Sequence, residues 1–205
     1  MREELKSVLE GITSARQLEA EFLNTLSLLE FTGARKISKT VAEHHPSLEV
    51  LDHLADETRH AAALKRLAVE VGGGEPGYIA REAAAKYFYK LDRELAAWVE
   101  DLVGQPDMVL TYRLVTTMIE RRAMVLYPLY RKASATSSVR DELRAIIIEE
   151  QGHRVAIEEA CVAMLEPYGV TSLAAPEAVE SAFFSAFLRE LAAEVEDRLV
   201  FEKSA

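Results

Sequence analysis

The sequence contains a single cysteine, Cys161, among its 205 residues. One cysteine excludes both an internal disulfide and a metal site built from several thiolates of this chain. The lack of a disulfide framework favours a reducing compartment, so we expect the protein in the cytoplasm. The residues that follow Met1 form no apolar signal core, which agrees with that expectation.

Long hydrophobic runs, glycine and proline are also scarce. No stretch approaches the roughly 18 uncharged apolar residues that a membrane helix needs, so we expect no membrane span. The nine glycines and six prolines gather at a few breaks between long segments. Because 49% of the residues are hydrophobic, the chain can fill one large core, and we predict a single domain over residues 1–205.

Positive charge is the remaining deficit, since the formal net charge is −10. A protein with this balance has no long-range attraction to phosphate backbones. Nucleic acid is therefore not an expected partner.

Apolar residues recur at spacings of three and four along most of the chain, and no segment alternates as a half-buried strand does. These patterns predict an all-α fold of about six helices, preceded by a short N-terminal helical turn interrupted near Gly11. The first, second, fourth and fifth helices are long enough to form a four-helix bundle. The predicted helices cover about residues 14–43, 48–71, 78–103, 108–133, 139–166 and 176–202.

Two stretches share the pattern acid-Glu-x-x-His, at residues 56–60 and 149–153, in the second and fifth predicted helices. Positions i and i+3 lie on nearly the same face of a helix, so each glutamate can bind a metal ion together with its histidine. Glu-x-x-His alone is a common pattern, but the acid before each glutamate makes the pair much more specific. We interpret the two stretches as halves of a dinuclear metal site.

Two further glutamates lie on apolar stripes of the helices that precede these motifs. Glu30 is in the first helix and Glu120 in the fourth, whereas Glu21 lies almost opposite Glu30 and is disfavoured. Four ionised acids buried without compensation would cost far more than a domain's net stability of about 5–15 kcal/mol, and two divalent cations would cancel their charge. An oxygen-rich site with one imidazole per metal suits two iron ions, with manganese or a mixed pair as alternatives.

The order Glu30, Glu57-x-x-His60, Glu120, Glu150-x-x-His153 resembles the ferritin-like di-iron carboxylate superfamily, which includes rubrerythrins, desaturases and aldehyde-deformylating oxygenases. The resemblance covers about residues 14–166 and implies a ferritin-like four-helix bundle. It implies that Glu57 and Glu150 are catalytic ligands that bridge the two metals and that Glu30 and Glu120 are terminal ligands. His60 and His153 would each complete one metal. Asp56 and Glu149 would each orient the histidine of the opposite motif.

A site of this kind predicts a di-iron oxidoreductase that activates dioxygen or peroxide. Its expected partners are a small or lipid-like apolar substrate and an electron-donor protein. Two alternatives stay open: iron oxidation or peroxide reduction of the ferritin and rubrerythrin type, and a non-catalytic helical interaction protein.

Other aromatic and histidine residues have more than one possible role. Helical spacing places Tyr127 near Glu120, where its phenol would support the site or simply pack. His53 lies one turn before Glu57, where it could support the site, but we favour a half-exposed structural histidine. We interpret His44 and His45 as loop residues. The cluster Phe183, Phe184 and Phe187 predicts a docking face for the last helix and leaves open a homodimer contact.

Overall fold

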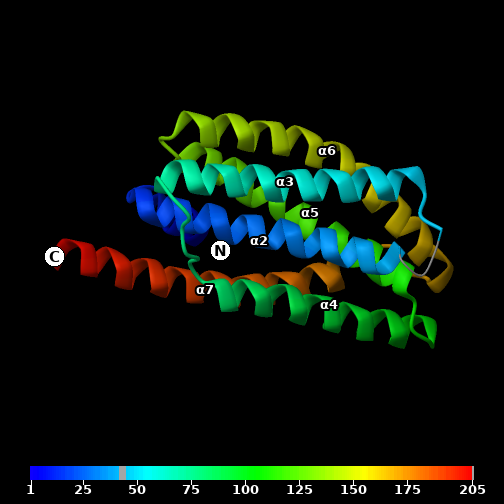
Figure 1. The fold of residues 1–205 in the computed structure, drawn as a ribbon. Helices are drawn as coiled ribbons and strands as arrows, with labels where there is room; N and C mark the ends of the chain where they lie inside the picture. The colour runs from blue at the N-terminus through cyan, green and yellow to red at the C-terminus, as the bar shows by residue number, and fades with distance from the viewer. Residues whose placement is uncertain (42–44, 205) are drawn as a thin grey trace.

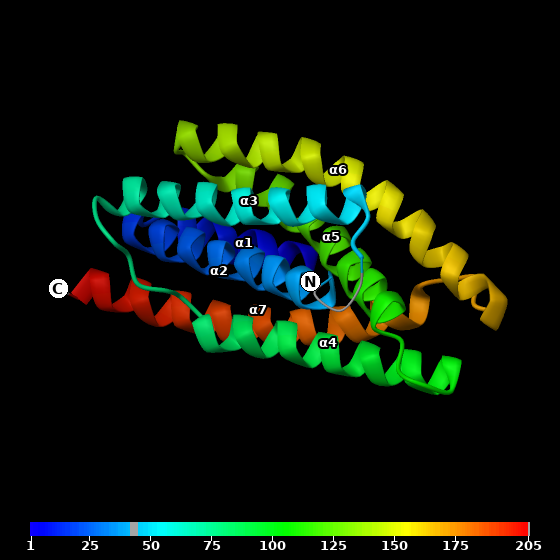
Figure 2. The same cartoon turned by 45° about the vertical axis from the view of Figure 1, so that its right-hand side comes forward.

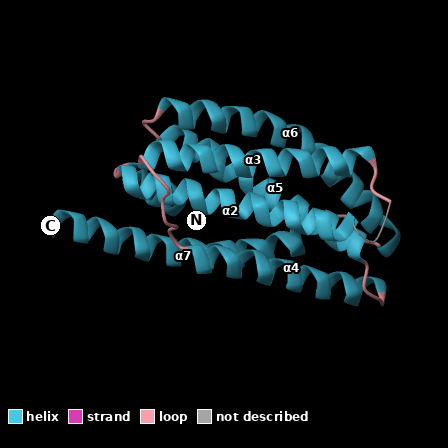
Figure 3. Ribbon diagram, in the orientation of Figure 1, coloured by secondary structure: helices cyan, strands magenta, loops and turns pink. Residues whose placement is uncertain are grey.

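A computed structural model describes residues 1–41 and 45–204, without the side chains of Val41, His153, Ala156 and residues 202–204. These residues form helices and no strand (Figure 3), which confirms the all-α class. The seven α-helices and one 3-10 helix are α1 (Arg2–Thr13), α2 (Arg16–Val41), α3 (Leu48–Gly72), α4 (Arg81–Val103), α5 (Met108–Ala133), α6 (Ser137–Leu165), η1 (Glu166–Tyr168) and α7 (Ala174–Ser204).

The N-terminus differs from the sequence prediction, because α1 is an uninterrupted helix that includes Gly11. A Cβ atom at Gly11 would lie 3.0 Å from Cγ1 of Val195 in α7, so this glycine allows close helix packing and causes no break. The chain leaves α1 at Ser14 instead. The predicted end of the first helix and His44 lie outside the described residues, while His45 is exposed and outside any helix.

The four helices that carry the predicted ligands form two close pairs. α2 packs along α3 and α5 along α6, and the pairs meet where α2 contacts α5 and α3 contacts α6 (Figure 1). α4 and α7 pack against each other and run beneath these four helices, as both views show (Figures 1 and 2). The predicted ligands therefore lie on helices that are neighbours in space.

Local sequence signals explain where several helices begin and end. Ser47 caps α3 as predicted, because its hydroxyl accepts a hydrogen bond from the Val50 amide. α4 begins at Arg81, three residues later than predicted, because buried Ile79 is held by a 2.6 Å hydrogen bond from the Thr25 hydroxyl to its carbonyl. This contact ties the loop before α4 to α2.

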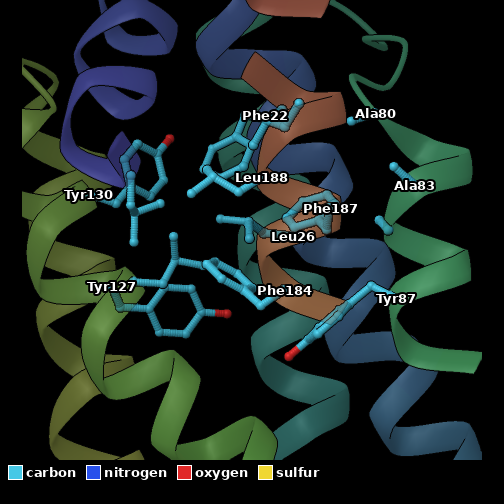
Figure 4. Packing of buried hydrophobic residues seen from close by; sticks show 14 of the residues in the cluster. Phe22, Leu26, Ala80, Ala83, Tyr87, Tyr127, Tyr130, Phe184, Phe187 and Leu188 are labelled. Atoms are coloured by element: carbon cyan, nitrogen blue, oxygen red, sulfur yellow. The ribbon is translucent and has the colours of Figure 1, made fainter. Parts of the chain in front are cut away.

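The hydrophobic core includes residues of all seven α-helices. Figure 4 shows Phe184 and Phe187 of α7 between Tyr127 of α5 and Tyr87 of α4. The rings of Phe184 and Phe187 lie 5.8 and 6.0 Å from the ring of Tyr87, which confirms that this cluster docks the last helix. None of the helices in the described part of the chain is long and apolar enough to cross a membrane.

Candidate metal centre

Six side chains from four helices converge between the two helix pairs. Glu30, His60 and Glu150 form one group, and His53, Glu57 and Glu120 form a second. Within each group, one possible ligand atom from every residue lies within 4.8 Å of the others. Five of these six residues belong to the predicted ligand set, so the structure brings them together as that prediction requires.

His60 is the central residue of the first group and is almost completely buried. Its Nδ1 atom lies 2.9 Å from Oε1 of Glu150, and its Nε2 atom lies 2.7 Å from Oε2 of Glu149. Arg59 donates a 2.8 Å hydrogen bond to the same Glu149 oxygen. This arrangement directs Nδ1 into the site and leaves Nε2 to donate to Glu149, which fixes the ring.

The charges around His60 depend on one another. Burial alone would lower the pKa of His60, but its contacts with Glu150 and Glu149 outweigh burial and raise the pKa to about 9. Burial would raise the pKa of Glu149, but hydrogen bonds from His60 and Arg59 lower it instead. Without a metal ion, His60 is therefore an imidazolium held between two carboxylates.

His53 is buried in the second group, with only 4% of its surface exposed, so the prediction that it is half-exposed was wrong. Its Nε2 atom lies 3.1 Å from Oε1 of Glu57 and 3.3 Å from Oε1 of Glu120. Its Nδ1 atom lies 3.0 Å from the hydroxyl of Tyr112. His53 thus has the arrangement of His60: one ring nitrogen faces the carboxylates and the other meets an orienting oxygen.

Tyr127 of α5 crosses the site to α2, where its hydroxyl donates a short hydrogen bond to Glu30. Burial, followed by the neighbouring charges of Glu57 and Glu150, raises the pKa of Glu30. Burial and the charge of Glu30 likewise raise the pKa of the Tyr127 phenol. Tyr127 therefore remains protonated and holds one oxygen of Glu30 in place.

Gly33 makes room for the carboxylate of Glu57. A Cβ atom at Gly33 would lie 2.9 Å from Oε2 of Glu57, closer than ordinary van der Waals contact. Gly33 is one turn of α2 after Glu30, so the helix that supplies one predicted ligand also gives space to another. Any larger residue here would push Glu57 away.

Two of the predicted residues cannot be placed completely. His153 lies on α6, but its side chain is outside the described part of the structure, as is any contact that Asp56 makes with it. Asp56 accepts a short hydrogen bond from Arg59. Arg59 therefore connects the acids that precede the two glutamates of the motifs, Asp56 and Glu149.

Glu120 gives the clearest test of whether this site fits cations. It is 2% exposed, and although Nε2 of His53 lies 3.3 Å from Oε1, neither oxygen accepts a well-aligned hydrogen bond from the described residues. Burial, followed by the nearby carboxylate of Glu150, raises the pKa of Glu120. Buried polar atoms without partners are costly, and a divalent cation would supply the missing partner. The oxygen-rich donor set with two imidazoles fits two such ions.

A cavity adjoins the carboxylates on the side of α4 and α7. Its volume is about 80 Å³, enough for several water molecules at roughly 10–15 Å³ each or for part of a small organic molecule. Glu30, Glu57 and Glu120 form part of its wall, and most of the remaining wall is apolar. The site therefore opens into a space that favours an apolar ligand.

The sequence did not predict the place of Gly33 in the site. The four-residue spacing from His53 to Glu57 places both on one face of α3 and allowed His53 to support the site, but it did not predict that His53 faces two of the carboxylates. Gly33 follows Glu30 by three residues inside a helical segment, where glycine is unfavourable without a packing reason. A glycine at this unfavourable position indicates that another part of the protein packs closely against the helix.

No protein-family model, curated protein or solved structure matches this chain.

Proposed function

We propose that this protein is a dinuclear-metal oxidoreductase with a ferritin-like four-helix bundle formed by α2, α3, α5 and α6. The observation that carries the proposal is the pair of three-residue groups that these helices bring together. Each group offers one imidazole and two carboxylates, which is a plausible set of protein ligands for one divalent ion. The four carboxylates balance the charge of two such ions.

In this proposal, Glu30, His60 and Glu150 would hold one ion, and His53, Glu57 and Glu120 would hold the other. Glu57 and Glu150 would be the ligands shared between the two ions. Supporting this, the charges of both residues raise the pKa of Glu30 and that of Glu120, so each lies close to both groups. Iron is the preferred metal because the ligands are mostly oxygen and include no thiolate, with manganese as the alternative.

When bound, the two ions supply the electrons that reduce dioxygen or peroxide. The side chains around them control geometry and access. Glu149 and Tyr112 fix the rings of His60 and His53, and Tyr127 fixes Glu30. The apolar cavity excludes bulk water from the carboxylates and gives an organic substrate a route to them.

The cavity favours oxidation of an organic substrate over iron oxidation or peroxide reduction alone. An iron-handling site needs a polar route for hydrated ions, whereas the space beside Glu30, Glu57 and Glu120 is mainly apolar. We therefore place an oxidase or oxygenase acting on a small apolar molecule first.

Metal content tests the proposal. Wild-type protein loaded anaerobically with ferrous iron is expected to retain two ions per chain and to change its absorbance when oxygen is admitted. Glu120→Gln removes a charge at nearly constant shape and should lower the retained iron. Glu19→Gln is the matched control, because Glu19 is equally buried but accepts hydrogen bonds from Ser134 and Thr136 away from the site.

Fewer than one tightly bound ion in the wild type would refute the dinuclear site and favour a non-catalytic interaction protein. Equal iron loss in both variants would show that Glu120 acts through general stability rather than as a ligand.

A further inference from the structure

The outer face of α6 carries apolar side chains that are open to solvent. α6 packs on α5 and α3 and lies at the edge of the bundle, away from α4 and α7 (Figures 1 and 2). On its outer face, Ile148, Val155 and Val162 are 59%, 47% and 38% exposed. Successive members of this trio are seven residues apart, close to two helical turns, so the three side chains form one stripe.

The surface beside this stripe leaves room for a partner. A surface hollow lies beside Val155 and Val162, and its other lining residues also come from α6 and from Glu166 directly after it. Ala145 and Ala163, both exposed, flank the stripe with small side chains. The face is therefore apolar and open to a second element, which is typical of an interaction surface.

The two ends of the stripe carry opposite charges. Arg144 lies four residues before Ile148, and Glu166 lies four residues after Val162. Both side chains are exposed, and neither forms an ion pair within the part of the chain that the structure describes. Each end can therefore accept an opposite charge from a partner.

The order of these residues is symmetric about Val155. In an antiparallel pair of α6 helices with a twofold axis at Val155, each residue faces the residue of the second copy that lies equally far on the other side of Val155. Ile148 then faces Val162, and Arg144 faces Glu166, each eleven residues from Val155. Apolar side chains therefore meet at the centre, and opposite charges meet at both ends.

Other occupants fit this face less well. A parallel pairing would place Arg144 opposite Arg144 and Glu166 opposite Glu166, and like charges in contact disfavour association. A membrane surface is disfavoured because a chain with a net charge of −10 is repelled by anionic lipids. In the antiparallel pair, the remaining facing residues Gln151 and Glu159 are an amide donor and a carboxylate acceptor.

We propose that two copies of this chain dimerise through the outer faces of α6, with the two helices antiparallel and Val155 on the twofold axis. The contact from Arg144 to Glu166 spans about 33 Å of helix, at a rise of about 1.5 Å per residue. A seam one helix wide is at the small end of protein interfaces, so the dimer dissociates on dilution. The dimer goes beyond the proposed metal chemistry and does not depend on it.

Sedimentation velocity of the full-length protein over a wide range of concentrations tests this inference. The wild type should shift from the mass of one chain, 22.8 kDa, toward twice that mass as the concentration rises. Val155→Glu should weaken association about a hundredfold or more, because two carboxylates would meet on the twofold axis. Tyr89→Glu is the matched control, since Tyr89 is 63% exposed on α4 at the other side of the bundle, and it should leave association within about twofold.

Exchange of the end charges tests the antiparallel register. Arg144→Glu and Glu166→Arg should each weaken association about tenfold, because each creates two like-charged contacts in the dimer. The two single variants change the net charge in opposite directions, so a loss in both cannot result from net charge. The double variant restores opposite charges at both ends and should associate within about threefold of the wild type. Arg144 and Glu166 lie too far apart in one chain to contact each other, so only a second copy can produce this recovery.

Three results would overturn the inference. A wild type that sediments as one chain at every concentration would leave this face to a different partner. Association that survives Val155→Glu would show that the dimer forms through another surface. A double variant that associates no better than the two single variants would exclude the antiparallel register. Because Val155 is exposed in the single chain, Val155→Glu should keep the wild-type circular dichroism spectrum, which separates loss of the dimer from loss of the fold.

Discussion

Substitution of Gly33 by alanine tests the geometry of the metal centre with a single methyl group. The new Cβ would lie 2.9 Å from Oε2 of Glu57, whereas ordinary contact begins at 3.4 Å. The carboxylate must therefore withdraw by about 0.5 Å, the difference between these distances. Metal-binding groups need to be held within about 0.5 Å of their productive positions, so this shift is large enough to matter.

We expect Gly33→Ala to reduce metal affinity by roughly tenfold to a hundredfold, the range found when a group that orients a ligand is lost. Two effects on the folded protein oppose each other. Alanine improves helix propensity by about 1 kcal/mol, and the tight contact costs about 1–3 kcal/mol. The melting temperature should therefore stay level or fall slightly, while metal affinity falls clearly.

Gly152→Ala is the matched control for this experiment. Gly152 also lies inside a helix, but a Cβ atom there would meet no described atom within 4 Å. This variant should gain about 0.5–1 kcal/mol from helix propensity, raise the melting temperature by roughly 1–4 °C and retain the wild-type metal affinity. Metal affinity measured by competition with a chelator checks both variants. Wild-type affinity in Gly33→Ala would refute the argument that Gly33 sets the position of Glu57.

Three further outcomes follow from the same geometry. His53→Gln should lower retained iron by about one ion per chain, and exposed His45→Gln should not; equal iron contents would remove His53 from the ligand set. Glu149→Gln should weaken metal affinity by roughly tenfold to a hundredfold in a chelator competition, and an unchanged affinity would contradict its orienting role. The metal-free protein should lose stability as pH rises, because a pKa of about 9 for His60 and a raised pKa for Glu120 mean that the folded state binds more protons than the unfolded state. The contribution of His60 to the free energy of unfolding is complete below its ordinary pKa of 6.5 and is lost as the pH rises through about 9. Denaturant titrations of the metal-free protein from pH 6 to 9.5 measure this free energy, and a value that does not fall would contradict the prediction.

The sequence predicted the all-α class and most helix boundaries because those features depend on local periodicity and capping. Ser47 and the Gly72–Gly74 break mark the ends of α3 with side-chain and backbone preferences that act within a few residues. The start of α4 depends instead on a contact between Ile79 and Thr25, which are far apart in the chain. Such a contact leaves no local pattern, and the prediction was wrong there by three residues.

The candidate site shows the same division between local and distant information. Glu57 and His60 share a helical face, which their spacing reveals, and Glu30 and Glu120 stand out as acids on apolar stripes. The depth of His53 in the protein was not predictable in this way, because α5 buries it through Tyr112 and Glu120.

The other buried glutamates of this chain show why protons alone do not explain the site. Glu19 accepts hydrogen bonds of 2.5 and 2.9 Å from Ser134 and Thr136. Glu180 accepts hydrogen bonds from Arg122 and Tyr87. At these positions the fold supplies donors to the acids that it buries. Glu120 is buried just as deeply, but neither oxygen accepts a hydrogen bond from the described residues, and its neighbours are Nε2 of His53 at 3.3 Å and further carboxylates. The fold supplies donors to Glu19 and Glu180, whereas at Glu120 a divalent cation would supply the contact that the described residues do not.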